Sequence, residues 1–314
     1  MNISICITTF NEENNISFLL ESLLGQTYKA DEIIVVDGGS KDKTVEIIRH
    51  FAKKDRRVKL LLEKCSRSRG RNIGIEVARS EIIAITDAGC VAKNDWLEKL
   101  VSPFANDSVG IAAGFYNMIG ESPLQKAMSI FLGVTPRKFN VNFLPSTRSM
   151  AFRKNVWEEV GGFPEKEYNT AEDTDFNYKA VKLGVRYSRV KDARVEWRMP
   201  ETLKDFYKKI FDYATWDIKY GIWWHPVQRL MSHNIKSVSI LLRYVIGLLL
   251  FFLSFKYGFL FPILAVLIFA YLFWSFRKVF IEFNRVDVAF YGPLLQITSD
   301  FGVMAGFLSG ILGR

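Results

Sequence analysis

Polar and acidic side chains follow three short apolar runs of this 314-residue chain, at the point where each run stops. Thr9 and Glu12 follow the first run, Asp37 follows the second and Asp87 follows the third. A carboxylate such as Asp37 could accept a hydrogen bond from a ribose or a base, although the Asp-Gly-Gly-Ser sequence is equally typical of a turn. Asp87 stands beside two small residues and could hold Mg²⁺ or Mn²⁺ against a diphosphate.

Basic side chains precede the third predicted helix. Arg67, Arg69 and Arg71 lie in its leading loop and first turn. Guanidinium groups match phosphate oxygens, and the N-terminus of a helix favours anions. A solvated basic loop is the alternative interpretation, and it fits any single arginine equally well.

Two further acids, Glu172 and Asp173, open a later predicted helix. Thr170 lies three residues before Asp173, which resembles a capping box with Asp at the position of Glu or Gln. An acid near the start of a helix is stabilised in its charged form, so this pattern predicts a lowered pKa for Asp173 and a weak base. The spacing alone therefore favours a helix cap over a catalytic acid.

The apolar runs predict the elements that position these groups. Residues 3–7, 33–36 and 82–86 are short, β-branched and apolar at successive positions, as in strands buried on both faces of a parallel sheet. Helical spacing of apolar residues between the runs predicts crossover helices, and a further strand is expected near residues 58–62. Ligands bind outside the carboxyl ends of such strands, so the polar clusters should border one site.

Composition restricts the class of protein. The formal net charge of +9 suits a nucleotide diphosphate or a membrane surface, and no nucleic-acid-binding motif is recognisable. Three scattered cysteines fit a reducing compartment and give no metal-like spacing. The N-terminus runs directly into a predicted strand without a secretory leader, so we expect the first domain in the cytosol.

Three regions are predicted along the chain. Residues 1–200 form an α/β domain, residues 201–236 an amphipathic segment that lies in the membrane interface, and residues 237–314 a membrane domain. A helix packed on the α/β domain with a solvated lysine face is the alternative for the middle region.

The last region contains a predicted helical hairpin. Residues 237–255 and 257–276 are each long enough to cross a hydrocarbon core, and basic residues at both outer ends place those ends in the cytosol. Residues 288–312 are either a third span or a surface segment, because Asp300 and several glycines interrupt them.

Six motifs in this chain, in this order and spacing, resemble those of family-2 glycosyltransferases. They are Ile7-Thr8-Thr9-Phe10-Asn11-Glu12, Val35-Val36-Asp37-Gly38-Gly39-Ser40-Lys41-Asp42-Lys43-Thr44, Arg69-Gly70-Arg71-Asn72-Ile73-Gly74, Thr86-Asp87-Ala88-Gly89-Cys90, Gly161-Gly162-Phe163-Pro164 and Ala171-Glu172-Asp173-Thr174-Asp175. The resemblance covers about the first 200 residues. It implies the GT-A fold, a nucleotide-diphospho-sugar donor, Mg²⁺ or Mn²⁺ as cofactor, and inverting transfer.

The resemblance also implies roles for individual residues. Thr9, Glu12 and Asp37 would hold the nucleoside, and Arg71 would lie near the base or the diphosphate. Asp87 would fill the first position of the metal motif and help to bind the donor. Asp173 would be the acceptor-activating base, with Glu172 on the acceptor side.

The chain departs from the family pattern at three places. Gly89 replaces the second acid of the usual Asp-x-Asp metal motif, and Trp197 stands where many relatives have His. The Gln-x-x-Arg-Trp signature of processive relatives is not found in residues 211–216, which favours transfer of a single sugar.

The sequence thus predicts an inverting glycosyltransferase anchored in the cell membrane, with a cytosolic catalytic domain. Its acceptor would be a hydroxyl of a lipid-linked saccharide; a polyprenyl phosphate is the alternative and needs no base. A sugar-nucleotide nucleotidyltransferase is a further alternative, but residues 8–12 lack the glycine-rich basic loop of those enzymes. The last alternative is a non-catalytic protein of the membrane that binds a ligand without transforming it.

Overall fold

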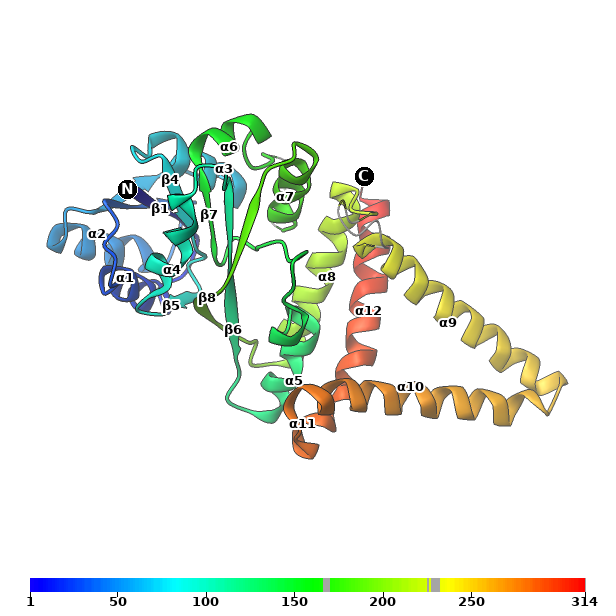
Figure 1. Cartoon of the computed structure of the whole chain (residues 1–314). Coiled ribbons are helices and arrows are strands. Elements are labelled where there is room, and N and C mark those ends of the chain that lie inside the picture. Colours follow the sequence, from blue (N-terminus) through cyan, green and yellow to red (C-terminus); the bar gives the residue numbers. More distant parts are fainter. Residues whose placement is uncertain (166–169, 225, 227–231, 314) are drawn as a thin grey trace. The chain divides into compact units, whose positions relative to one another are not determined.

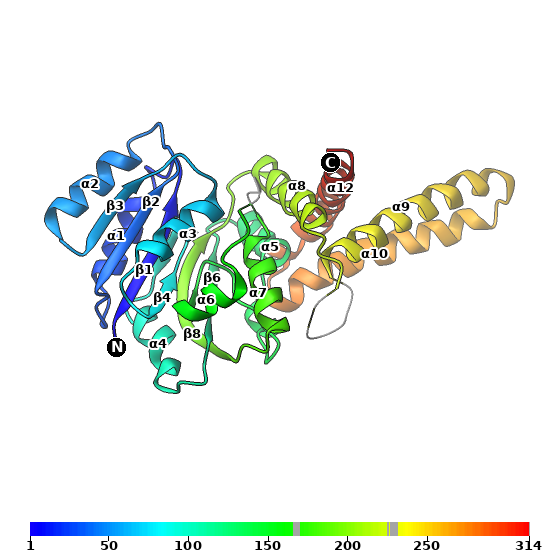
Figure 2. The same cartoon turned by 90° about the horizontal axis from the view of Figure 1, so that it is seen from above.

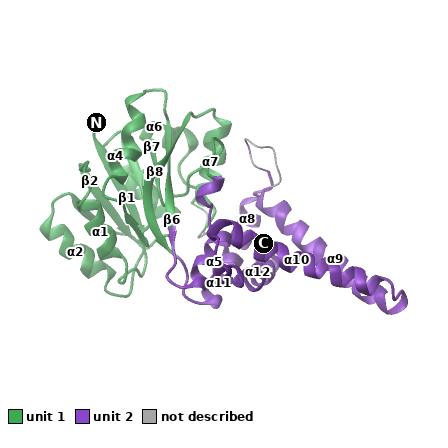
Figure 3. Cartoon of the chain, turned by 60° about the horizontal axis from the view of Figure 1, so that its bottom comes forward, with its two compact units in different colours: residues 1–117, 139–198 green, residues 118–138, 199–314 purple. Residues whose placement is uncertain are grey.

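The computed structural model describes residues 1–165, 170–224, 226 and 232–313 of the chain. These residues divide into two compact units (Figure 3). Unit 1 comprises residues 1–117 and 139–198, and unit 2 comprises residues 118–138 and 199–314. Residues 118–138, which the sequence groups with the α/β domain, therefore cluster with the C-terminal helices.

Unit 1 is built on a mixed sheet with eight strands in the described residues (Figure 1). The strands are β1 (Ile3–Thr9), β2 (Glu32–Asp37), β3 (Val58–Leu62), β4 (Ile82–Ile85), β5 (Cys90–Ala92), β6 (Ile111–Ile119), β7 (Met150–Arg153) and β8 (Tyr187–Arg198). Their order across the sheet is β3-β2-β1-β4-β7-β6-β8-β5. The first four are parallel, as their continuous apolar runs predict, whereas β7 pairs antiparallel with both β4 and β6.

Helices connect these strands. In unit 1 they are α1 (Ile16–Leu24), α2 (Thr44–Lys54), α3 (Arg67–Val77), α4 (Trp96–Val101), α6 (Lys154–Val160) and α7 (Glu172–Lys182), with a 3₁₀ turn at Ser102–Ala105. The chain moves outward through β1, β2 and β3 and then returns past β1 to β4. Right-handed crossovers therefore place α1 and α2 on one face of the sheet and α3 on the other.

One hydrophobic core of unit 1 lies between the sheet and the helices α3, α6 and α7. Cys6, Val36 and Ile85 from the parallel strands pack there with Phe152 of β7 and Phe176 of α7. The three cysteines of the chain are free thiols, in keeping with the absence of a disulfide pattern. This core fixes the ends of β1, β2 and β4 relative to the first turns of α3 and α7, where the candidate site residues lie.

Unit 2 is helical. Its elements are α5 (Pro123–Leu132), a 3₁₀ turn at Pro136–Lys138, α8 (Leu203–Tyr220), α9 (His233–Lys256), α10 (Leu260–Phe283), α11 (Val286–Ala289) and α12 (Tyr291–Leu312). The helices α9 and α10 form a hairpin, and each is longer than the sequence predicts. They overlap in Figure 2, whereas Figure 1 shows that they diverge from the turn that joins them.

Among the described residues of unit 2, three stretches are long and apolar enough to cross a membrane: α9, α10, and Val286–Leu312, which comprises α11 and α12. Large apolar side chains on α9 and α10 are exposed, among them Phe252, Phe255 and Phe269. Exposure of so many aromatic and aliphatic side chains is unfavourable in water and favourable in lipid. The chain is therefore expected to associate with a membrane.

Asp300, which interrupts the third apolar stretch, is fully buried in unit 2. Its Oδ2 accepts hydrogen bonds from Arg243 Nη2 at 2.6 Å, from Tyr244 Oη at 3.1 Å and from Tyr271 Oη. Its Oδ1 accepts from Gln296 Nε2 at 3.0 Å. Asp300 is thus paired with side chains of α9, α10 and α12. A buried and paired acid is tolerated within a membrane-spanning helix, so Asp300 is compatible with a third span.

The amphipathic helix α8 has a protein partner in unit 2. Three glycines of α12 lie at intervals of four residues, and a Cβ at Gly306 or Gly310 would come within 2.3 Å of the Phe211 carbonyl oxygen or 1.9 Å of Ile218. The small residues let α12 lie against the apolar face of α8. That face, which the sequence assigns to the membrane interface, is therefore covered by protein.

Candidate functional site

The carboxyl ends of β1 and β2 lie side by side, with Thr9 opposite Asp37 in the register. Asp37 Oδ1 accepts from the backbone N–H groups of Gly39 at 3.0 Å and Ser40 at 2.8 Å, and Ser40 Oγ donates to Oδ2 at 2.5 Å. Asp37 thus shapes its own turn. Within the described residues, the buried Thr9 hydroxyl makes no hydrogen bond. Both side chains lie where the sequence predicts them.

The loop that carries Glu12 is tied to the loop after β2. The N–H of Glu12 donates to Thr44 Oγ1 at 2.8 Å, and the N–H of Asn11 donates to Ser40 Oγ at 2.8 Å. Glu12 Oε2 accepts from Asn15 Nδ2 at 2.8 Å, and Asn15, the N-cap residue of α1, makes no side-chain capping bond. These bonds connect the loops that follow β1 and β2, so Thr9, Glu12 and Asp37 lie together at the carboxyl ends of these strands.

The helix α3 starts against the same strand ends. Ser66 caps it by accepting from the N–H of Arg69, and a Cβ at Gly70 would lie 2.9 Å from Thr8 Cγ2. The glycine therefore allows the first turn of α3 to approach β1 closely. Because of this close approach, the side chain of Arg71 reaches Asp87, which follows the end of β4.

Arg71 joins two of the predicted acids. Its side chain is 1% exposed; Nη1 donates to Glu172 Oε1 at 2.5 Å, and Nη2 donates to Asp87 Oδ1 at 2.9 Å and to Thr147 Oγ1 at 3.1 Å. The structure therefore brings the end of β4 and the first turn of α7 together through one guanidinium. The guanidinium of Arg71 is already paired with the carboxylates of Glu172 and Asp87. Its role in the structure is therefore to position these two acids rather than to offer an open phosphate site.

The other two arginines of the basic loop behave differently. Arg69 lies in the first turn of α3, where it pairs with Glu165 at 2.9 Å and approaches Glu76 at 3.6 Å, so it is a solvated basic side chain in a helix instead of a loop. Arg67 acts on Asp87 electrostatically. Burial would raise the pKa of Asp87, but Arg71, Arg148 and Arg67 outweigh it and hold the pKa below its ordinary value. Asp87 is consequently ionised.

Asp173 has the opposite shift. Partial burial and the adjacent carboxylate of Glu172 raise its pKa to about 6, against the attraction of Arg148 and Arg71. Its Oδ1 accepts from the N–H of Thr174 at 2.8 Å, within its own helix. A carboxylate with a raised pKa accepts protons more readily than an ordinary Asp.

The helix cap predicted for Thr170 is wrong. The residue that caps α7 is Ala171, in a left-handed conformation with φ of 69° and without a side-chain hydrogen bond. The Thr170 hydroxyl is buried without a partner in the described residues. The expected lowering of the Asp173 pKa by the helix terminus is also wrong, because burial and Glu172 dominate. Left-handed alanine is strained, and such strain clusters at functional sites.

Arg148 is a site residue that the motifs do not predict. Its guanidinium lies 3.8 Å from the centroid of the Trp197 ring and 5.6 Å from that of Tyr116, and it acts on both Asp87 and Asp173. The ring of Trp197 thus makes a cation–π contact with Arg148. The sequence signal was an arginine two residues before the buried strand β7, in a segment with no helical or strand periodicity.

The residues present are compatible with a divalent ion held mainly by a donor diphosphate. The described part of the chain contains no group of three or more His, Cys, Asp or Glu side chains arranged as metal ligands. Asp87 is a quarter exposed and ionised, and a Cβ at Gly89 would meet nothing within 4 Å. One carboxylate beside open space suits Mg²⁺ or Mn²⁺ that keeps phosphate oxygens among its ligands.

The model of glycosyl transferase family 2 matches residues 4–162, which is half of the chain. The chain belongs to glycosyl transferase family 2. A second model, described as glycosyl transferase family group 2, matches residues 89–276. The family motifs on β1, β2, α3 and β4 are therefore confirmed as a family resemblance, and the mixed sheet is a GT-A fold.

Curated relatives of this glycosyl transferase family 2 chain match over part of their length. Glycosyltransferase AglE of Haloferax volcanii is 30% identical over 169 residues, covering 52% of this chain and 56% of that protein. Glycosyltransferase GlyG of Streptococcus pneumoniae serotype 4 is 33% identical over 158 residues, covering 50% and 51%. The match thus spans about half of each relative.

Solved structures share the fold of the whole chain. A mannosyltransferase from Pyrobaculum calidifontis, in complex with GDP-Man and Mn²⁺, is 19% identical with a TM-score of 0.61, covering 100% of this chain and 88% of that one. S. aureus TarS residues 1–349, in complex with UDP-GlcNAc, is 19% identical with a TM-score of 0.54, covering 100% and 93%.

Proposed function

We propose that the chain transfers one sugar, with inversion, from a nucleotide-diphospho-sugar to an acceptor at the membrane surface. The observation that carries this proposal is the Arg71 bridge, which joins ionised Asp87 to Glu172, the neighbour of Asp173 in the chain. Transfer to a hydroxyl needs a base on the acceptor side, and a carboxylate on the donor side can hold a metal ion. Here Asp87 and Glu172, which precedes Asp173, bind the two terminal nitrogens of one guanidinium.

Donor binding is assigned to the strand ends. Thr9, with its unpartnered hydroxyl, and the carboxylates of Glu12 and Asp37 would contact the nucleoside. Arg148 would face the diphosphate, because it acts on Asp87 and Asp173 at once. A divalent ion at Asp87 would supply positive charge that stabilises the departing diphosphate. The complexes of the two structural neighbours with GDP-Man and UDP-GlcNAc support a nucleotide-sugar donor.

The chemical step follows from the raised pKa of Asp173. An acceptor hydroxyl oxygen forms a bond to the anomeric carbon while the bond from that carbon to the diphosphate oxygen breaks. The hydroxyl proton passes to Asp173, and the nucleoside diphosphate leaves with the electron pair. Glu172, held by Arg71, keeps the pKa of Asp173 high and borders the acceptor side.

A hydroxyl acceptor is favoured over a polyprenyl phosphate for the same reason. A phosphate oxygen is already anionic and needs no base, so a carboxylate with a raised pKa would serve no purpose there. The exposed apolar surfaces of α9 and α10 support an acceptor borne on a lipid. We place the catalytic unit on the cytosolic side, where nucleotide sugars and the basic ends of the hairpin would meet.

A thermal-shift screen tests the donor assignment. The full chain in detergent is heated with UDP-, GDP- and dTDP-sugars, with and without Mn²⁺, and a ligand that binds the native state raises the melting temperature. We expect one nucleotide class to raise it in the presence of Mn²⁺, and Asp87→Asn to reduce that rise at the same Mn²⁺ concentration. No rise with any nucleotide sugar would contradict the proposal.

A further inference from the structure

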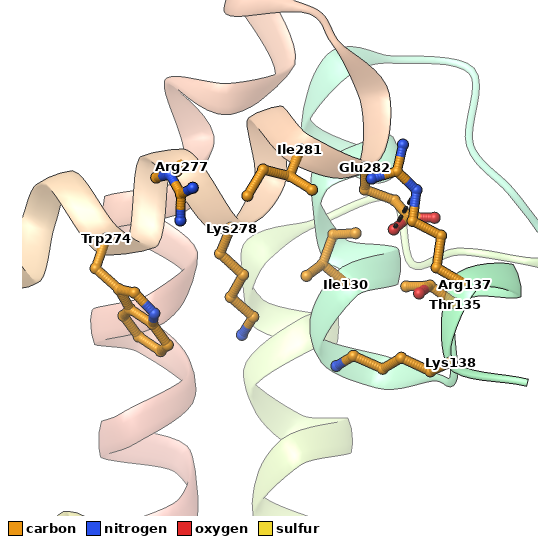
Figure 4. Close-up of a pocket in the computed structure, with 9 residues that line it drawn as sticks. All are labelled: Ile130, Thr135, Arg137, Lys138, Trp274, Arg277, Lys278, Ile281 and Glu282. Carbon is orange, nitrogen blue, oxygen red and sulfur yellow. Dashed lines mark ion pairs between the residues drawn. The ribbon is translucent and has the colours of Figure 1, made fainter. Parts of the chain in front are cut away.

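Unit 2 contains a pocket of about 270 Å³ that the transfer reaction does not use. Figure 4 shows nine lining residues from α5, the segment after it, and the C-terminal part of α10. Four of them are cationic and one is acidic: Arg137, Lys138, Arg277, Lys278 and Glu282. Cations gathered in one concave site repel each other, and a bound anion offsets that repulsion.

The internal pairing leaves an excess of positive charge. Arg137 Nε lies 3.9 Å from Glu282 Oε2, so the negative charge of Glu282 is paired with Arg137. Lys278 Nζ donates to the neutral Gln296 Oε1 at 3.3 Å and lies 4.0 Å from the centroid of the Phe131 ring. Arg277 forms no ion pair with any described residue, and Glu282 is the one acid among the described lining residues that faces the four cations.

A buried hydroxyl points to a bound ligand independently of the charges. Thr135 is 3% exposed and lines the pocket, and its Oγ1 has no hydrogen-bond partner in the described residues. A buried hydroxyl without a partner is costly, about 1–3 kcal/mol, unless a ligand or water pairs with it. Figure 4 draws its oxygen within the group of lining side chains.

The position of the pocket along α10 indicates its depth in a membrane. Phe269 and Phe273, on the preceding turns, are exposed apolar side chains. Trp274 is half-exposed and lines the pocket, and the cations begin with Arg277. Tryptophan followed by cations marks the level where acyl chains end and phosphates of lipid headgroups begin.

We propose that this pocket binds the phosphate group of a membrane lipid. Lys138, Arg277 and Lys278 neutralise the anion, the Thr135 hydroxyl donates to one of its oxygens, and Trp274 contacts the adjoining acyl region. The inference does not depend on the proposed transfer reaction, because no residue of the Arg71 network lies in the pocket.

Native mass spectrometry of the full chain in detergent micelles tests this proposal. The micelles contain dioleoyl phosphatidic acid, or dioleoylglycerol, which has the same chains and no phosphate. We expect one molecule of phosphatidic acid to bind at least tenfold more tightly than dioleoylglycerol. The double variant Lys138→Gln with Arg277→Gln should lose at least tenfold in affinity.

Two control variants separate a built site from general attraction. Arg285→Gln removes a cation that pairs with Asp287 outside the pocket, and it should change the affinity less than twofold. Thr135→Val leaves the charge unchanged and should weaken binding severalfold, whereas Thr135→Ser should retain it. The melting temperature of each variant, and its rise with the donor, report folding and the transfer site separately.

Three results would overturn the proposal. The first is unchanged affinity in the double variant, and the second is an equal loss in Arg285→Gln, which would indicate a diffuse basic surface. The third is displacement of phosphatidic acid by inorganic phosphate at an equal concentration, which would indicate a site for a soluble anion.

Discussion

Two networks of charged side chains, one in each unit, differ in how completely their acids are paired. In unit 2, Asp300 accepts hydrogen bonds from four side chains that lie on α9, α10 and α12. In unit 1, Arg71 serves both Glu172 and Asp87, while Asp173 beside them accepts from Thr174 of its own helix. A fully paired acid stabilises a fold, whereas a crowded and underpaired acid is suited to take a proton.

The largest expected effect is a loss of kcat when the underpaired acid of unit 1, Asp173, is replaced. Asp173→Asn removes the base but keeps the size of the side chain, so kcat with a hydroxyl acceptor should fall about 10²- to 10⁴-fold. The donor-induced rise in melting temperature should stay close to that of the wild type. Steady-state transfer assays measure the first effect and thermal shift the second.

Comparison of two acceptors sharpens this result. With a polyprenyl phosphate in place of the hydroxyl acceptor, Asp173→Asn should leave any transfer nearly unchanged, because that oxygen needs no base. An equal loss with both acceptors, with donor binding intact, would contradict the role of Asp173 as a base.

Removal of divalent ions should have the next largest effect. EDTA should suppress transfer, and added Mn²⁺ or Mg²⁺ should restore it, since Asp87 stands beside open space for an ion and a diphosphate. Asp87→Asn should raise the Mn²⁺ concentration needed for half-maximal transfer about 10- to 100-fold. Full activity in EDTA would exclude the proposed metal site.

The paired network in unit 2 should affect stability instead of chemistry. Asp300→Asn removes the negative charge that pairs with Arg243 and turns one of the two accepting oxygens into a donor, which should cost about 1–3 kcal/mol. We expect a lower melting temperature in detergent and an unchanged kcat for the folded fraction. Asp287→Asn, at an exposed ion pair, is the matched control and should cost about 0–1 kcal/mol. A loss of kcat in Asp300→Asn would contradict the distinction between the networks.

The smallest expected effect is a shift in pH dependence. Arg148 lowers the pKa of Asp173, so Arg148→Gln should raise that pKa and move the acidic limb of kcat to higher pH. Arg69→Gln, which alters a surface ion pair, should leave the limb in place. Measurement of kcat from pH 4 to 8 in the two variants distinguishes them.

Much of unit 1 follows from local sequence. The runs at β1, β2 and β4 are β-branched and apolar on both faces, so they predict parallel strands, and their polar ends predict where Thr9, Asp37 and Asp87 lie. The antiparallel strands β6, β7 and β8 have no such pattern, because their pairing depends on residues far apart in the chain.

The chemical character of the site was less predictable. Nothing local in Thr170 or Ala171 signals a left-handed residue, so the spacing to Asp173 wrongly indicated a cap. The raised pKa of Asp173 depends on burial and on Glu172, while the buried role of Arg71 depends on Asp87, 16 residues away, and on Glu172, 101 residues away. Such contacts exist only after folding, which is also why Arg148 was missed.

The pH profile of kcat for the wild type and Asp173→Asn tests the central claim most directly. A base must be deprotonated to act, so wild-type kcat should fall as the pH drops through about 6, where Asp173 becomes protonated. The residual activity of Asp173→Asn should lack this limb. A wild-type profile that is flat from pH 7 to pH 5, or a limb that persists in the variant, would contradict the account.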